Sequence, residues 1–233
     1  MNDYNKYSSA DESPVERIFA IVGEAETVLT LTMGRTAKTP RGNETLSALL
    51  GSGARAEVLR LFLIDPMRDY YQRQIEAATG LPIRAVQREL ERLSKIKLLY
   101  RRSEGNRTYY QVDTQFSLFQ DLRNLFLRAG TPLERVRGEA AIEPSVILLV
   151  YNETEGRLLL VYTGGREPEV GSSELLPIDT MTRDEFMLAL AGRDPRVDSY
   201  LRVGVDMLGR REDVIWRRIE AAGYEVPKGK GVA

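Results

Sequence analysis

Residues 80–95 read GLPIRAVQRELERLSK. Gly80 suits a tight turn, and Pro82 suits the first position of a helix because its ring fixes φ near the helical value. Four apolar residues then recur at helical spacing and share one face, namely Ile83, Val86, Leu90 and Leu93. The opposite face carries polar and charged side chains. The stretch therefore predicts a turn followed by an amphipathic helix.

The residues on either side predict the elements that pack with this helix. Apolar spacing predicts a buried helix that stops before Asp65-Pro66, and the pattern changes from helical to strand-like after Lys97. The expected elements in chain order are helices over 54–63 and 71–79, the helix from residue 82, strands over 98–102 and 107–112 joined by a turn at 104–106, and a helix over 116–129.

The amino-acid composition excludes several kinds of chemistry. The 233 residues include neither cysteine nor histidine, which rules out disulfides, zinc fingers, Cys or Ser-His-Asp nucleophiles and imidazole acid–base catalysis. The longest apolar run, Val146–Tyr151, is far shorter than the roughly 18–20 residues that cross a bilayer. The first residues are polar and lack the apolar segment of a secretory signal. We therefore expect a cytoplasmic protein with no membrane span.

Charge is distributed unevenly along the chain. The net charge of the whole chain is −1, but residues 51–112 contain 12 Lys and Arg against 7 Asp and Glu. The other residues contain 21 Lys and Arg against 27 Asp and Glu. A basic segment in an otherwise acidic protein favours a nucleic-acid partner for that segment.

The order of these elements matches a known class of DNA-binding domain. Residues 49–129 resemble the winged helix-turn-helix of ArsR/MarR-type regulators, in particular through residues 51–59, 86–93 and 105–110. These blocks are similar to a subgroup that carries a nucleotidyltransferase-like domain behind the DNA-binding domain. The resemblance implies an α+β fold in which the helix from Pro82 is the recognition helix. The cysteines and histidines with which ArsR repressors sense metals are missing, so metal sensing is not implied.

The resemblance and the charge pattern together predict the residues that contact double-stranded DNA. Arg and Gln on a helix in the major groove can pair with base edges, and Arg on the following hairpin can contact phosphates or the minor groove. The candidate DNA contacts are Tyr71, Arg73, Arg84, Gln87, Arg88, Arg92, Lys95, Arg101, Arg102, Asn106 and Arg107. Taken alone, an Arg-rich helix face is more often just a solvated surface.

The helix over 116–129 has the spacing of a contact between helices. Phe119, Leu122, Phe126 and Ala129 follow one another at intervals of three, four and three residues. We expect Phe119, Leu122 and Phe126 to join two chains in a homodimer.

The last hundred residues predict a mixed α/β region. The expected strands are 145–151, 157–162, 175–179 and 203–208, and the expected helices are 182–191, 196–202 and 212–222. Thr182 and Glu185 have the spacing of a capping box, and Trp216 is expected to anchor the last helix to the core.

The resemblance of this region to polymerase β-type nucleotidyltransferases extends to strand order but not to chemistry. Those enzymes need a Gly-Ser pair for the triphosphate and an Asp-x-Asp for two magnesium ions, whereas this chain has Tyr151-Asn152 and, by alignment of the strands, Gly156 and Leu158. Carboxylates at Glu153, Glu155, Glu174 and Asp179 are expected to be solvated rather than to bind a cation. Loops at 164–166 and 171–173 are expected to be flexible rather than to bind an anion. An unrelated α/β fold remains an alternative.

The expected domain organisation follows from these elements. Residues 1–44 form a polar tail, a helix from Ser13 to about Gly34 and a linker. The other segments are a winged helix-turn-helix at 45–115, a connecting and dimerising helix at 116–130, a degenerate nucleotidyltransferase-like domain at 140–226 and a tail at 227–233.

The sequence thus predicts a sequence-specific, dimeric DNA-binding transcription regulator. Its second domain is expected to be catalytically inactive, without a metal or cofactor, and to serve sensing or assembly. An active nucleotidyltransferase guided by the winged helix and a protein-interaction adaptor are the alternatives. The missing Asp-x-Asp argues against the first, and the local positive charge argues against the second. No small-molecule effector is identified by the sequence.

Overall fold

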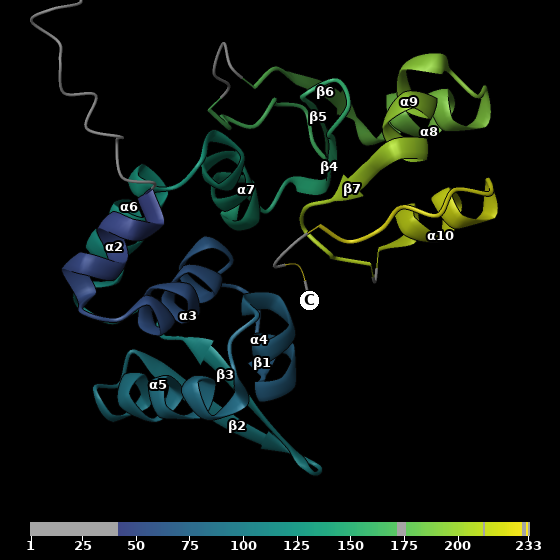
Figure 1. The fold of residues 1–233 in the computed structure, drawn as a ribbon. Coiled ribbons are helices and arrows are strands. Elements are labelled where there is room, and N and C mark those ends of the chain that lie inside the picture. Colours follow the sequence, from purple (N-terminus) through teal and green to yellow (C-terminus); the bar gives the residue numbers. More distant parts are fainter. Residues whose placement is uncertain (1–41, 172–175, 212, 230–231, 233) are drawn as a thin grey trace, which may run out of the picture. The chain divides into compact units, whose positions relative to one another are not determined.

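The structure, a computed structural model, describes residues 42–171, 176–211, 213–229 and 232. Within these ranges the chain forms nine helices and two β-sheets, so the fold is mixed α and β (Figure 1). The helix expected over 13–34 lies outside the described residues. We refer to residues 42–129 as the N-terminal body and to residues 132–229 as the C-terminal body, because each has hydrophobic cores of its own.

The N-terminal body begins with two helices, α2 (Gly42–Leu50) and α3 (Gly53–Ile64). Gly51 between them has φ +65°, which glycine adopts without steric cost. The Ser52 side chain accepts a hydrogen bond from the backbone N–H of Arg55 and so caps α3. The expected helix over 54–63 is therefore confirmed, but α2 was missed, because residues 42–44 were assigned to a linker.

The turn and helix expected from residues 80–95 are present. α4 (Gln72–Thr79) ends at Gly80, which has φ +69°, and α5 (Ile83–Lys95) begins directly after Pro82. Val86 and Leu90 are buried in the core of the N-terminal body together with residues of α3 and α4. This burial holds α5 with one face inward.

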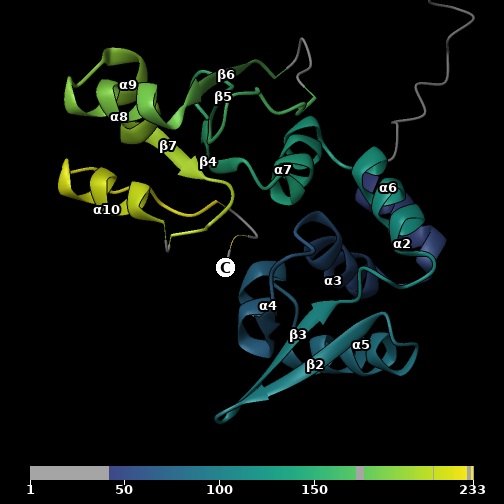
Figure 2. The same ribbon diagram turned by 180° about the vertical axis from the view of Figure 1, so that it is seen from behind.

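The expected β-hairpin is formed by β2 (Leu99–Glu104) and β3 (Arg107–Val112). Gly105 has φ +59° at the first central position of the two-residue turn, where a type II′ turn requires a positive φ. A strand that was not predicted, β1 (Tyr70–Tyr71), pairs with the other edge of β3, which gives the order β1-β3-β2. In both views the closed end of the hairpin projects away from the helices (Figures 1 and 2).

The last helix of the N-terminal body, α6 (Phe119–Ala129), corrects the expected dimer contact. Phe119 and Phe126 are 3% and 1% exposed and belong to the chain's own core, and Leu122 packs against it. The spacing does mark a contact between helices, but the partners are α2 and α3 of the same chain, and α2 lies beside α6 in both views (Figures 1 and 2). These phenylalanines are therefore not available to a second chain.

A helix that was missed, α7 (Pro132–Ile142), begins the C-terminal body. Thr131 and Glu134 form a capping box, in which the Thr131 hydroxyl accepts from the Glu134 N–H and the Glu134 carboxylate accepts from the Thr131 N–H. The start signal Thr-Pro-x-Glu was thus present in the sequence.

The second sheet lies in the C-terminal body and has the strand order β6-β5-β4-β7. Its strands are β4 (Val146–Asn152), β5 (Arg157–Tyr162), β6 (Ile178–Thr182) and β7 (Gly204–Asp206). β5 runs antiparallel to β4 and parallel to β6. β6 begins three residues later than predicted, because Pro177 has no N–H to donate and precedes the strand.

Helices cover both faces of this sheet. α8 (Arg183–Ala191), α9 (Pro195–Val203) and α10 (Val214–Ala221) share a core with one set of alternate residues of β4 and β5, and α7 shares a core with the other set. Burial on both faces explains the uninterrupted apolar runs of these two strands. Trp216 is 2% exposed in the first of these cores, as expected of an anchor for α10. Within the described ranges, no helix combines the length and apolar character that a bilayer crossing needs.

Candidate nucleic-acid interface

The outward face of α5 carries the polar side chains that the sequence placed there. Val86, Leu90 and Leu93 are buried on the inner side, so the intervening positions face solvent. Five candidate DNA contacts are exposed on this helix, namely Arg84, Gln87, Arg88, Arg92 and Lys95. α5 thus presents four cations and one amide to solvent.

The β2–β3 hairpin adds a second group of exposed cations. Arg101 and Arg102 are exposed on β2, Arg107 on β3, and Asn106 in the turn. Arg101 and Arg102 are adjacent in one strand and therefore point to opposite faces of the hairpin. Arg73 is exposed in the first turn of α4.

Two tyrosines organise two arginines in the half of the hairpin near its turn. The Arg107 guanidinium lies 4.8 Å from the centre of the Tyr71 ring, and the Arg102 guanidinium lies 5.8 Å from that of Tyr109. The two rings contact each other edge to face, with their centres 5.8 Å apart. Cation–π contacts of this kind orient a guanidinium and leave its charge in place. Tyr71 therefore positions a cation, which is a role the sequence did not distinguish from DNA contact.

Arg102 differs from its neighbours because acidic side chains already bind it. Its guanidinium lies 2.8 Å from the Asp69 carboxylate and 3.4 Å from that of Glu104. The hydrogen bond to Asp69 raises the pKa of Arg102 above its ordinary value. An incoming phosphate would have to compete with these two carboxylates for Arg102.

A buried carboxylate joins α5 to α3. Glu89 is 1% exposed, and its two oxygens bind Arg55 of α3 at 3.1 Å and Arg92 of α5 at 2.8 Å. Arg92, although exposed, is thus partly neutralised as well. Charges buried in this way need partners, because an unpaired carboxylate in the core is strongly destabilising.

The remaining cations of the interface have no acidic partner. Among the residues that the structure describes, six candidate cations form no ion pair. Arg107 is one of them, but its guanidinium lies over the Tyr71 ring; the other five are Arg73, Arg84, Arg88, Lys95 and Arg101. They lie on α4, on the outward face of α5 and on β2. The structure therefore divides the sequence-predicted cations into a free set and a set that is bound within the chain.

Sequence reasoning missed three residues that shape this interface, namely Asp69, Gln72 and Glu89. Gln87 donates a hydrogen bond from Nε2 to Oε1 of Gln72 at 3.1 Å, and Gln72 donates from Nε2 to the Tyr110 hydroxyl at 3.4 Å. The ion pair of Asp69 with Arg102 spans 33 residues, so the local pattern contains no sign of it. Only Glu89 could have been noticed in the sequence, because a charged residue at an inward helical position indicates a buried ion pair.

The carboxylates of the C-terminal body lie apart from one another in the described ranges. No three acidic side chains come together there in a way that would hold a metal ion. Leu158 is fully buried in a core, and Glu153 and Glu155 are exposed in the turn that Asn152 closes by accepting backbone hydrogen bonds. Asp179 is bound by Arg157 and by the Tyr200 hydroxyl. Glu174 and residues 172–173 lie outside the described residues.

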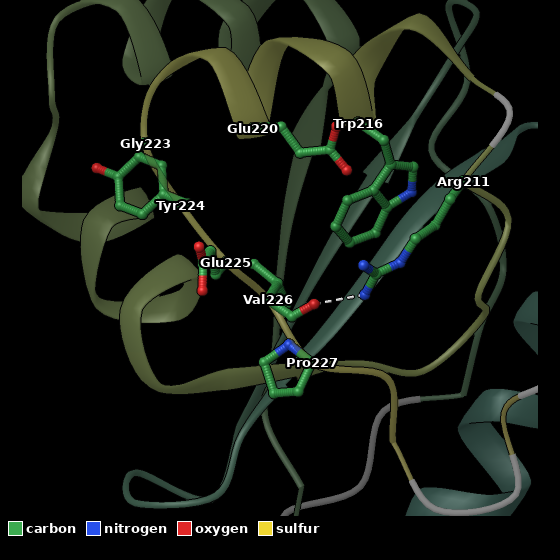
Figure 3. Close-up of a pocket in the computed structure, with 8 residues that line it drawn as sticks. All are labelled: Arg211, Trp216, Glu220, Gly223, Tyr224, Glu225, Val226 and Pro227. Atoms are coloured by element: carbon green, nitrogen blue, oxygen red, sulfur yellow. Dashed lines mark hydrogen bonds between the residues drawn. The ribbon is translucent and has the colours of Figure 1, made fainter.

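A cavity of about 540 Å³ in the C-terminal body is lined by residues of α10 and of the segment that follows it (Figure 3). The Arg211 guanidinium stacks on Trp216 at 4.5 Å from the ring centre, and its Nε lies 3.1 Å from the Asp206 carboxylate. Figure 3 also shows Arg211 donating to the Val226 carbonyl. Because Arg211 is bound by groups of its own chain, we assign it a structural role.

Comparison of the chain with protein families, with curated proteins and with solved structures finds no match.

The Glu89 contacts predict a stability effect. Replacing Glu89 with Gln should lower the free energy of unfolding by about 1–3 kcal/mol, because Arg55 and Arg92 lose a charged acceptor in a buried position. Glu91→Gln is the matched control, since Glu91 is exposed on the same helix, and its effect should stay within about 0.5 kcal/mol. Urea unfolding followed by circular dichroism measures both. Equal midpoints for the two variants would contradict a structural role for Glu89.

Proposed function

We propose that this chain is a sequence-specific DNA-binding transcription regulator whose DNA-binding part is a winged helix-turn-helix. In this proposal α3, α4 and α5 are its helices, α5 enters the major groove, and the β2–β3 hairpin is the wing. The helix order, the turn at Gly80 and the hairpin directly after α5 support this assignment.

The observation that carries the proposal is the set of cations without acidic partners. Arg84, Arg88 and Lys95 are exposed on α5, and Arg101 is exposed on the hairpin that follows it. A protein surface gains nothing in stability from unpaired like charges, whereas a polyanion binds such a surface with release of counterions. An α-helix fits the major groove of B-DNA, where Arg and Gln match base edges.

For the C-terminal body we propose a degenerate nucleotidyltransferase-like domain that serves sensing or assembly. A hairpin of apolar strands, β4 and β5, is present without acidic residues at the positions expected for magnesium ligands, where the chain has Gly156 and Leu158. The sheet then acts as a scaffold.

The proposal predicts distinct effects for the cations of the interface. Arg88→Ala should weaken binding to a selected site by about 1–3 kcal/mol, because a side chain on the recognition helix meets base edges. Arg101→Ala should weaken binding to selected and to random duplexes by similar factors, because the variant loses a phosphate contact. For the same reason, the slope of log affinity against log salt concentration should fall by roughly one unit. Arg102→Ala should have a smaller effect than Arg101→Ala, since Asp69 and Glu104 already bind Arg102.

Arg217→Ala provides the control for these measurements, because Arg217 is exposed on α10 of the C-terminal body. Its affinity for either duplex should equal that of the unchanged protein. Titrations of a fluorescent duplex with each of the four variants, at two salt concentrations, measure these affinities and their salt dependence. If undetectable or salt-insensitive binding were found for the unchanged protein, the DNA-binding proposal would be wrong.

We also propose that the regulator is a dimer that reads a two-fold related site, with contacts other than the buried phenylalanines. Leu118 and Leu125 are 54% and 39% exposed and lie two helical turns apart at α6, and Leu49 of the neighbouring α2 is 67% exposed. Changing Leu118 and Leu125 together to Glu should convert a dimer to a monomer in sedimentation equilibrium at micromolar concentration. The control is Leu188→Glu on α8, where Leu188 is 76% exposed. A monomeric unchanged protein whose DNA complex contains one chain would refute the dimer.

The proposed inactivity of the C-terminal body predicts no nucleotidyl transfer. Incubation of the protein with each labelled ribonucleoside triphosphate and magnesium should give no incorporation into protein, RNA or small acceptors, because Gly156 and Leu158 stand where the two metal-binding aspartates are expected. Incorporation that disappears in Glu153→Ala or Glu155→Ala would instead show an enzyme.

A further inference from the structure

We infer that Gln87 reads adenine in the major groove and that Gln72 and Tyr110 orient its amide for this purpose. This inference rests on the proposed function and adds the base that one residue of α5 selects. It comes from two consecutive hydrogen bonds that join the side chains of Tyr110, Gln72 and Gln87 and so connect the core of the N-terminal body to the exposed face of α5.

The first of these hydrogen bonds is made by a buried side chain, Tyr110. Tyr110 on β3 is 8% exposed and its hydroxyl accepts from Nε2 of Gln72 at 3.4 Å. Gln72, the first residue of α4, is half-buried, and its Oε1 accepts from Nε2 of Gln87 at 3.1 Å. Gln72 thus donates from its amide nitrogen to Tyr110 and accepts at its amide oxygen from Gln87.

This direction leaves Gln87 with a defined pair of free groups. The Gln87 amide has two N–H donors and one oxygen, and Gln72 takes up one donor. One N–H and Oε1 remain for an external partner. Adenine presents N7 as an acceptor and the N6 amino group as a donor on its major-groove edge, which complements this pair.

The other bases complement the pair less well. Guanine presents two acceptors, O6 and N7, so the Gln87 oxygen would face an acceptor. Cytosine offers one donor, and thymine offers one acceptor beside a methyl group. Because the Gln87 side chain is already ordered by Gln72, its orientation need not be selected again when it binds DNA.

The position of Gln87 fits this role. It lies in the first half of α5, the part of a recognition helix whose side chains meet base edges. Arg84 and Arg88 flank it and form no ion pair within the described ranges, so both are free to pair with neighbouring groups of the duplex. A purely structural hydrogen bond between α4 and α5 is the competing explanation.

Selection from a duplex library with randomised bases, using the full chain, tests the inference. The unchanged protein should enrich sites with adenine at one position of each half-site. Gln87→Ala should lose the preference at that position alone, and Gln72→Leu should weaken it there to a smaller extent. Glu91→Gln, on the same exposed face, should keep every preference. Circular dichroism and binding to random duplex identify variants that have not folded.

A single-atom change in the DNA makes the test specific. Replacing that adenine with 7-deazaadenine removes N7 and should weaken binding by the unchanged protein about tenfold. The same replacement should not alter the affinity of the Gln87→Ala variant. The inference is overturned if Gln87→Ala keeps all preferences, if the lost preference is for another base, or if Gln72→Leu leaves the adenine preference intact. Enrichment of no sequence by the unchanged protein would overturn the proposed function itself, and the inference with it.

Discussion

Glu89 is a carboxylate in the core of the N-terminal body, held between Arg55 of α3 and Arg92 of α5. A buried carboxylate is tolerated only where its partners meet it, so this contact restricts how α5 can rotate against α3. The apolar face formed by Val86, Leu90 and Leu93 allows some rotation by itself, because side chains of similar size can repack. With Glu89 fixed, Gln87 and Arg88 must face solvent. The outward face of α5, on which the proposed DNA contacts lie, therefore depends on an ion pair on its inner side.

The N-terminal body shows which features a local pattern can reveal. Residues 80–95 predicted the turn, and they predicted the start of α5 to within one residue, because glycine, proline and the helical spacing of apolar residues all agree there. β1 was not predictable, since two residues contain no alternation and pair only because β3 offers a free edge. The spacing of Phe119 and Phe126 correctly indicated contact between helices. It could not reveal that the partner helices belong to the same chain.

The sequence predicted which residues lie at the candidate interface, but not which contacts they make with one another. Every candidate DNA contact is exposed, apart from the half-buried Tyr71 on β1. What the sequence could not separate were the cations that bind acids of their own chain from those that do not. That distinction depends on Asp69 and Glu89, which lie far along the chain from Arg102 and Arg55 and meet them only after folding. In the C-terminal body, similarly, α7 covers a sheet face whose burial the apolar run of β4 had implied, but the helix itself was missed.

Trp216 is the single tryptophan of the chain, and it lies in the core of the C-terminal body with Arg211 stacked on its ring. The three strands of the N-terminal body contain tyrosines but no tryptophan, namely Tyr70, Tyr71, Tyr100, Tyr109 and Tyr110. Light absorbed selectively by tryptophan is thus emitted from one body only, and the protein contains an optical reporter that is blind to local events at the other. A change in the wavelength of that emission would report a change in the surroundings of Trp216 and not one at the hairpin. The intrinsic tryptophan fluorescence of the unlabelled protein therefore follows the C-terminal body alone.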